Sequence, residues 1–147
     1  MNTDFISSID DILKDLKEGK MVIMVDDEDR ENEGDLIVPA EKVDDYAINF
    51  MATHGRGLIC LSLTLERVKE LDIPLMAQNN QGRDTTAFTV SIEAKEGVTT
   101  GISAQDRATT IHTAINSNKT KDDFPLRKYV MPINVNSLRN SNMISKF

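Results

Sequence analysis

Apolar residues near the start of the chain recur at intervals of three and four, at Ile9, Ile12, Leu13 and Leu16. This spacing places them on one face of a helix and predicts a helix over residues 8–18. Ser7 or Ser8 can cap its start, because a serine hydroxyl accepts a hydrogen bond from the backbone of the first turn. Gly19 lies where this helix should end.

Two short apolar runs follow the first helix, at residues 20–25 and 36–40. Both are bounded by polar residues and predict strands. The connection between them is too short for a crossover helix, so we expect the two strands to be antiparallel. We also expect them to be neighbouring core strands that hold the connection on a rigid platform.

The remaining pattern interleaves helices and strands. A second helix is marked by Val43, Ala47, Phe50 and Met51 and should end at the glycines of THGRG. A buried strand is predicted over residues 57–63, a short helix over 64–71, an alternating strand over 85–94, and a helix capped by Ser103 over 103–115. Because the elements do not follow a strict βαβα repeat, we expect an α+β fold, with a mixed sheet and flanking helices.

Composition narrows the class of protein. A chain of 147 residues is long enough for one domain with a real core. The single cysteine, Cys60, has no partner for an intramolecular disulfide and is expected to be a buried core thiol. No secretory signal or membrane-spanning apolar run is apparent, which favours a reduced, cytoplasmic protein without a membrane partner.

Charge is distributed unevenly along the chain. The net charge of −7 argues against nucleic acid as a partner, because phosphate binding needs a basic surface. Residues 1–117 hold 11 Lys and Arg against 22 Asp and Glu, whereas residues 118–147 hold 6 against 2. The basic segment also lacks a sustained hydrophobic period. We therefore expect residues 118–147 to form an irregular tail, with 129–135 as its best candidate for order.

The connection between the first two predicted strands is the most unusual feature of the sequence. Seven of the ten residues from Asp26 to Asp35 are acidic, and Arg30 is the one basic residue among them. Clustered carboxylates repel one another and raise each other's pKa unless a positive charge lies between them. One interpretation is a solvated acidic turn. The other is a site for a hard divalent cation, Mg²⁺ in the first place, whose ligands are carboxylate and substrate oxygens.

Other polar residues have both structural and functional interpretations. His54 precedes a glycine and is expected to end a helix rather than bind a ligand, and His112 is expected to face solvent. Thr99, Thr100 and Ser103 precede the helix of 103–115, whose N-terminus could bind a phosphate. The simpler interpretation, which we prefer, is that Ser103 is the helix cap.

Four blocks of the sequence together resemble 3,4-dihydroxy-2-butanone 4-phosphate synthase, an enzyme of riboflavin biosynthesis. They are DDEDRENEGD (26–35), HGRGLICLSLT (54–64), NN with TAFTVSIEA (79–80 and 86–94), and EGVTTGISAQDRATTI (96–111). All four follow the family's order and spacing. The resemblance extends from about residue 7 to residue 117.

The resemblance implies a lyase that converts D-ribulose 5-phosphate to L-3,4-dihydroxy-2-butanone 4-phosphate and formate. Members of this family use Mg²⁺ or Mn²⁺ and are homodimers with an α+β fold and an active site near the dimer interface. On this basis residues 1–117 form the N-terminal part of the family domain, and residues 118–147 form a divergent basic tail.

The resemblance also assigns roles to residues of the acidic connection. Carried over by position, Arg30, Glu31 and Asp35 contact substrate, and Glu31 also binds the metal. Glu31, Glu33 and Asp35 are the expected catalytic residues, and Asp26 is a candidate for proton transfer or for ordering the loop. The family further places the cysteine at position 60 close to the active site.

The chain departs from the family near its end. Family members continue for several tens of residues, through a GHTEA segment with a metal-binding histidine and then a further catalytic glutamate. This sequence has no such motif, and Tyr129 stands where the family has an important histidine. Two hypotheses therefore stay open: an enzyme that needs the missing residues from elsewhere, and a truncated, non-catalytic relative that at most binds Mg²⁺ or a sugar phosphate.

Overall fold

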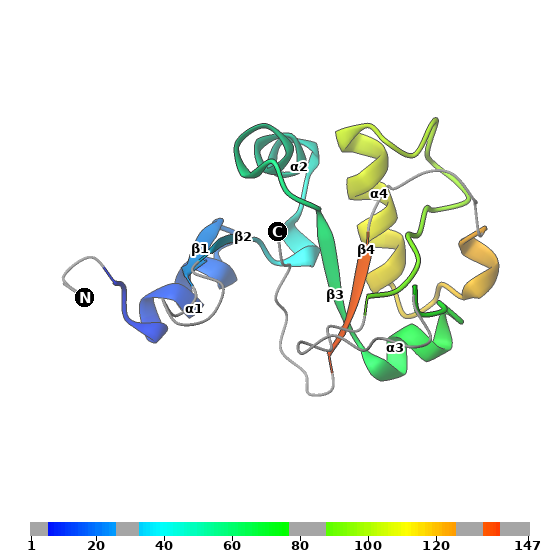
Figure 1. The fold of residues 1–147 in the computed structure, drawn as a ribbon, viewed down its shortest axis with the longest axis horizontal. Helices are drawn as coiled ribbons and strands as arrows, with labels where there is room; N and C mark the ends of the chain where they lie inside the picture. The colour runs from blue at the N-terminus through cyan, green and yellow to red at the C-terminus, as the bar shows by residue number, and fades with distance from the viewer. Residues whose placement is uncertain (1–5, 26–32, 77–87, 126–133, 139–147) are drawn as a thin grey trace.

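The computed structural model describes residues 6–25, 33–76, 88–125 and 134–138 (Figure 1). Its elements, in chain order, are α1 (Ile9–Lys17), β1 (Val22–Val25), β2 (Gly34–Ile37), the 3-10 helix η1 (Ala40–Lys42), α2 (Asp45–Phe50), the π-helix η2 (Met51–Gly55), β3 (Cys60–Thr64), α3 (Leu65–Glu70), α4 (Ala104–Ile115), the 3-10 helix η3 (Lys121–Asp123) and β4 (Asn134–Leu138).

Hydroxyl side chains start three of the helices. The side-chain oxygens of Ser8, Thr64 and Ser103 each accept a hydrogen bond from a backbone N–H three residues on, at 3.2, 3.2 and 3.0 Å. Each satisfies a donor that a helix start leaves without an intrahelical partner. Gly19 ends the α1 region with a φ of +81°, which glycine adopts readily. The predicted helices at 8–18, 64–71 and 103–115 are thus confirmed.

β1 and β2 form an antiparallel hairpin, as expected. The register pairs Val22 with Ile37 at one end and Val25 with Gly34 at the other. The expectation that both are core strands is wrong for β1, where Val22 is buried but Ile23 and Val25 are 66% and 60% exposed. Among the described residues this sheet has two strands only.

The second sheet joins distant parts of the chain. β3 pairs with β4 in parallel, from Cys60 opposite Asn134 to Thr64 opposite Leu138. Figure 1 shows α4 alongside this pair, while α1 and the hairpin lie at the other end of the molecule. The mixture of helices with antiparallel and parallel strands is the α+β fold that the sequence predicts. The segment after residue 117 contributes η3 and β4, and the domain division at 117 stays a prediction.

The predicted strand over 85–94 is only partly formed in its described part, residues 88–94. Thr89 pairs with Leu75 in an antiparallel bridge, and two backbone hydrogen bonds of 2.9 Å join residues 88–90 to residues 74–76. Farther along, the N–H of Ala94 donates to the hydroxyl of Thr110 on α4, at 3.1 Å. The described segment is therefore held by a short stretch of backbone pairing and by a helix side chain. Residues 85–87 lie outside the described part.

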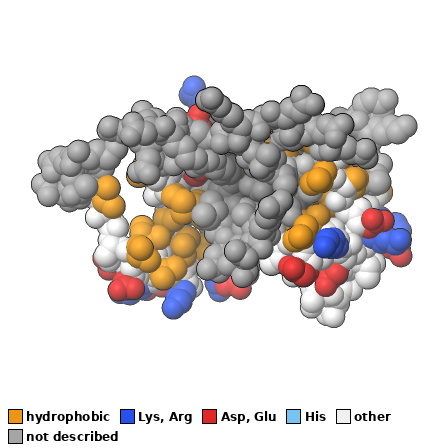
Figure 2. Space-filling view, turned by 60° about the horizontal axis from the view of Figure 1, so that its bottom comes forward, with side chains coloured by type: hydrophobic (Ala, Val, Ile, Leu, Met, Phe, Trp, Pro, Cys, Tyr) orange, Lys and Arg blue, Asp and Glu red, His pale blue; other side chains and the backbone are white. Residues whose placement is uncertain are grey.

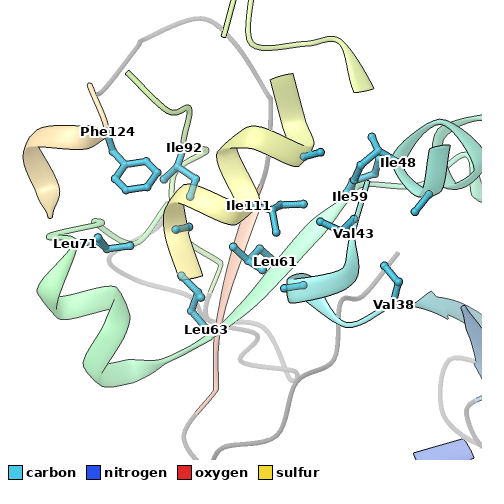
Figure 3. Close-up of a cluster of buried hydrophobic side chains, with 14 of the residues drawn as sticks. Val38, Val43, Ile48, Ile59, Leu61, Leu63, Leu71, Ile92, Ile111 and Phe124 are labelled. Atoms are coloured by element: carbon cyan, nitrogen blue, oxygen red, sulfur yellow. The ribbon is translucent and has the colours of Figure 1, made fainter. Parts of the chain in front are cut away.

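The hydrophobic core lies between α4, β3 and the segments around them (Figure 3). Leu61 and Leu63 of β3 face the Ile111 side of α4, and Ile48 extends the cluster onto α2. Phe124 closes it near Ile92. All of these side chains are less than 9% exposed.

Arg67 ties α3 to the end of α4. Its guanidinium donates to the carbonyl oxygens of Ala114, Asn116 and Lys119 at 2.9, 2.7 and 3.0 Å. Carbonyls at a helix C-terminus lack intrahelical donors, and a cation is favourable there. Arg67 thereby joins elements that are distant in sequence. None of the helices in the described ranges is long and apolar enough to cross a membrane.

Candidate functional site

The hairpin brings the two ends of the acidic connection together. Val25 and Gly34 are paired, so the chain leaves β1 and re-enters β2 at neighbouring positions. Residues 26–32 lie outside the described residues, and with them Asp26, Arg30 and Glu31. The roles of these three residues therefore stay predictions. The described part of the motif consists of Glu33, which is exposed, and the first residues of β2.

Asp35 lies on β2 opposite Met24 and is half-buried. Side chains alternate between the faces of a strand, so Asp35 shares a face with the buried Ile37 and not with Leu36. Asp35 is near enough for its charge to act on the thiol of Cys60 at the start of β3.

Cys60 is a buried thiol, as the sequence predicts. Its side chain is 3% exposed at the start of β3. Burial, together with the smaller effect of the negative charge of Asp35, raises the pKa of this thiol to about 11. The thiolate is the nucleophilic form of cysteine, so Cys60 is not suited to nucleophilic chemistry near neutral pH. The neutral Cys60 thiol is better suited to line the site than to react in it.

The N-terminus of α4 already holds an anion from the protein. The carboxylate of Asp106 accepts hydrogen bonds from the N–H groups of Thr99, Thr100 and Gly101 at 3.1, 3.2 and 2.9 Å, and from the hydroxyl of Thr99 at 2.9 Å. Burial alone would raise the pKa of Asp106, but these hydrogen bonds outweigh it and lower the pKa. Ser103 is the helix cap, which confirms the simpler interpretation.

The role of Asp106 was missed at the level of sequence. Its position three residues after Ser103 indicated a helix start. That position did not indicate that the Asp106 carboxylate accepts hydrogen bonds from the loop of residues 99–101. Gly101 makes this closure feasible: it has a φ of +79°, and a Cβ there would lie 2.5 Å from Oε1 of Glu93. Sequence contains a partial signal, since Thr-Thr-Gly followed closely by Ser-x-x-Asp supplies the donors and the acceptor.

Each of the two histidines contacts another residue of the fold. His54 lies in the π-helix η2, is exposed, and its ring centroid is 4.5 Å from that of Phe50. His112 is exposed, as expected, and a nitrogen of its ring lies 2.8 Å from the carbonyl oxygen of Val43. In the described ranges no three His, Cys, Asp or Glu side chains are grouped so that they could hold a metal ion.

A groove with a volume of about 390 Å³ lies on the other face of the hairpin from Asp35. Ile23 and Leu36, which are paired across the two strands, contribute one wall. Ala47 and Phe50 of α2 contribute to another. The groove is mainly apolar, with Lys42 and Asp44 among its lining residues. The hairpin therefore has an acid-bearing face toward β3 and an apolar face toward this groove.

Comparison with known proteins decides the family. A sequence model described as 3,4-dihydroxy-2-butanone 4-phosphate synthase matches residues 10–138. The chain belongs to this synthase family. The match confirms the resemblance of the four blocks and extends beyond residue 117 to the end of β4.

Relatives from the synthase family are identical to this chain at about half of the aligned positions. It is 52% identical over 128 residues to 3,4-dihydroxy-2-butanone 4-phosphate synthase from Photobacterium phosphoreum, covering 87% of this chain and 35% of the relative. It is 53% identical over 129 residues to the riboflavin biosynthesis protein RibBA from Aquifex aeolicus, covering 86% and 32%. The chain thus spans about a third of the length of these relatives.

Solved synthase structures have the same fold. The two-domain synthase RibBX from A. baumannii superimposes with a TM-score of 0.79 at 46% identity, covering 89% of this chain and 38% of that one. A synthase in complex with two magnesium ions gives 0.83 at 36% identity, covering 90% and 61%. These likenesses confirm the α+β synthase fold.

Proposed function

We propose that this chain acts in the 3,4-dihydroxy-2-butanone 4-phosphate synthase reaction of riboflavin biosynthesis. In that reaction D-ribulose 5-phosphate yields L-3,4-dihydroxy-2-butanone 4-phosphate and formate. The observation that carries the proposal is the family match over residues 10–138, which includes the whole acidic connection. The pairing of Val25 with Gly34 supports the proposal, because it holds the two ends of this connection next to each other.

The chemistry requires bases beside a substrate whose oxygens gain negative charge. Enolisation moves a proton from a substrate carbon to a carboxylate, and a later step returns a proton. Glu31, Glu33 and Asp35 are the proposed bases, and Arg30 is the proposed contact for the phosphorylated ketose. Asp35 is the best-positioned described member, because β2 fixes its backbone and the buried Cys60 lies beside it.

The donor set fits a magnesium ion. Carboxylate oxygens are the ligands that Mg²⁺ prefers, and Mn²⁺ also accepts them. Glu31 is the proposed ligand, and Glu33 and Asp35 belong to the same acidic connection. When bound, the ion would stabilise negative charge on substrate oxygens. A solved relative in complex with two magnesium ions supports the choice of metal.

The assembly and location follow the family expectation. We propose a homodimer that works in the cytoplasm on a small sugar phosphate. The net charge of −7 supports a partner other than nucleic acid.

The second candidate function is binding of Mg²⁺ or a sugar phosphate without turnover. The chain covers 61% of the magnesium-bound relative, and its sequence has no GHTEA segment. A chain with the acidic connection but without the further histidine and glutamate could bind Mg²⁺ or a sugar phosphate without turnover. This candidate predicts binding in the absence of formate production.

One assay separates the two candidates. The purified chain is incubated with D-ribulose 5-phosphate and Mg²⁺, and formate is measured. Under the first candidate Glu31→Gln abolishes formate, because the side chain loses its charge and its basic oxygen. Glu66→Gln, in the first turn of α3 and outside the motif, is the matched control and should retain activity.

Absence of formate at high protein concentration rejects catalysis by this chain alone. A Mg²⁺-dependent rise in melting temperature that Glu31→Gln removes would then support the second candidate. No formate and no thermal shift would reject both.

A further inference from the structure

Arg56 has a backbone conformation that its residue type does not favour. Its φ is +62°, in the left-handed region, and its N–H donates to the carbonyl oxygen of Met51 at 3.3 Å. Left-handed backbone is strained for residues other than glycine, and asparagine and aspartate tolerate it best. Gly55 and Gly57 flank Arg56, yet neither has a positive φ. A glycine at position 56 would end the helix without this strain.

The segment before Arg56 is also uncommon. η2 is a π-helix, and Arg56 is the residue that caps its C-terminus. Short π-helical segments are rare and are often found at functional sites. Backbone strain likewise persists where a function requires it and the surrounding structure can hold it. A strained arginine after a π-helix therefore indicates that the side chain has a role beyond ending the helix.

The guanidinium of Arg56 is free to bind a ligand. Arg56 is exposed, and among the described residues its side chain has no ion pair or hydrogen bond. By contrast, Lys20, Arg67 and Lys119 form ion pairs with carboxylates at 2.8, 2.9 and 2.9 Å. Figure 2 shows basic and acidic side chains interspersed on one face of the molecule. Arg56 thus differs from these basic residues in having an uncompensated charge.

Arg56 lies between the elements that carry Asp35 and Cys60. η2 contacts β2, the strand of Asp35. Four residues after Arg56 the chain reaches Cys60 at the start of β3, where the charge of Asp35 acts on the thiol. Figure 1 shows the coil of α2 and η2 leading into β3. The cation is therefore close to the described end of the acidic connection.

The chemistry of a sugar phosphate calls for a cation in such a place. A phosphate monoester has a charge of about −1.5 to −2 at neutral pH, and the carboxylates of the acidic connection repel it. A guanidinium offers paired N–H donors that match phosphate oxygens. A simpler interpretation is that Arg56 only complements the carbonyls at the end of η2. That interpretation leaves the strain unexplained, because a basic residue in the last turn could do the same from an ordinary helical backbone.

We propose that Arg56 binds the phosphate group of the sugar phosphate. Its guanidinium donates to the phosphate oxygens, while the carbon atoms that react lie toward Asp35. The left-handed turn after η2 fixes the direction in which the side chain leaves the backbone. The inference rests on the proposed function and adds a substrate-binding residue outside the acidic connection.

The experiment measures binding of D-ribulose 5-phosphate to the chain in the presence of Mg²⁺ by isothermal titration calorimetry. Arg56→Gly should raise Kd at least about tenfold, because a charge-assisted, two-pronged contact is lost. The same variant should have an unchanged or higher melting temperature, because glycine adopts a positive φ without strain. Its thermal shift with Mg²⁺ alone should also be retained, because Glu31 is the proposed metal ligand. A purely structural role for Arg56 predicts a lower melting temperature instead.

Asp72→Gly is the matched control. Asp72 is the other described non-glycine residue with a positive φ, of +51°, and it follows the end of α3. Its replacement relieves the same kind of strain and should leave Kd unchanged. Arg56→Asn is a second uncharged variant, since asparagine tolerates the left-handed region, and it should weaken binding as Arg56→Gly does. It takes the place of Arg56→Gly if the glycine variant does not fold.

The outcomes separate this inference from the proposed function. An unchanged Kd in the Arg56 variants would overturn the inference, and so would an equal loss of affinity in Asp72→Gly. If Glu31→Gln lost binding while the Arg56 variants kept it, the proposed function would stand without Arg56. No binding of D-ribulose 5-phosphate by the unmodified chain would reject the proposed function, and the inference with it.

Discussion

The two ends of this molecule differ in how many hydrogen bonds and buried side chains they have among the described residues. Around α4, Arg67 donates to three carbonyls at the helix end, and Asp106 accepts four hydrogen bonds at the helix start. At the other end, α1 has no buried residue, and Ile23 and Val25 of β1 are exposed. The comparison teaches that, among the described residues, packing and hydrogen bonding are denser around α4 than at α1 and β1.

The largest expected effect comes from shortening a helical isoleucine at each end. Ile111 of α4 is 4% exposed and Ile9 of α1 is 78% exposed. Ile111→Ala should lower the free energy of unfolding by about 2–5 kcal/mol, because it leaves a cavity in the core. Ile9→Ala should change it by less than about 0.5 kcal/mol. Urea denaturation measures both values, and similar losses for the two variants would contradict the comparison.

A smaller effect is expected from the carboxylate that closes the start of α4. Asp106→Asn should lower the free energy of unfolding at pH 7 by about 2 kcal/mol, because hydrogen bonds to a charged acceptor are lost. The pKa of Asp106 is lowered in the folded protein. Its contribution is therefore present above the unfolded pKa near 3.8 and is lost as pH falls through the folded pKa.

The control for Asp106 is the pH dependence itself. Melting temperatures measured between pH 6 and pH 2.5 should converge for the unmodified chain and Asp106→Asn at the acid end. A constant difference over this whole range would show that the charge of Asp106 does not stabilise the loop.

The smallest expected effect concerns the reactivity of the Cys60 thiol and its dependence on Asp35. Burial is the main reason for the raised pKa of Cys60, and the charge of Asp35 is the lesser one. Asp35→Asn should therefore increase the rate of reaction with a thiol reagent at pH 8 by less than about tenfold. Asp45→Asn, at the start of α2, is the control and should leave the rate unchanged. An unchanged rate in Asp35→Asn would show that the charge of Asp35 does not act on the thiol of Cys60.

Local signals in the sequence were sufficient to predict the helices. Ser8, Thr64 and Ser103 each have a side-chain oxygen that accepts a hydrogen bond from a backbone N–H in the first turn of the helix. Gly19 tolerates a positive φ. These properties depend on a few neighbouring residues. The antiparallel hairpin was also predictable, because a connection of about ten residues is too short for a crossover.

Non-local partners explain the failures. The alternation in residues 85–94 resembles that of a strand, but the N–H of Ala94 has the hydroxyl of Thr110 as its partner. The apolar run of β1 predicts burial on both faces, yet Ile23 and Val25 are exposed, because burial depends on what packs over a strand. Neither fact can be read from the residues of one segment.

The candidate site was predictable in composition and not in arrangement. The density of acids around Arg30 and Glu31 indicated cation and sugar-phosphate chemistry, and those roles stay predictions. The proximity of Asp35 to Cys60 joins β2 to β3 across the intervening helices, and the sequence holds no periodic signal for it. The loop held by Asp106 is local, and the sequence contains a partial signal for it, in the Thr-Thr-Gly donors that precede Ser103 and Asp106.

The parallel pairing of β3 with β4 has a consequence for biosynthesis. Cys60 emerges from the ribosome long before Asn134, its partner in the register. During that interval the growing polypeptide holds a buried-type strand without its neighbour, and contacts of large sequence separation form slowly. Folding of the layer that contains β3 and β4 must therefore await the synthesis of residues 134–138, and until then the nascent polypeptide is more vulnerable to aggregation and proteolysis.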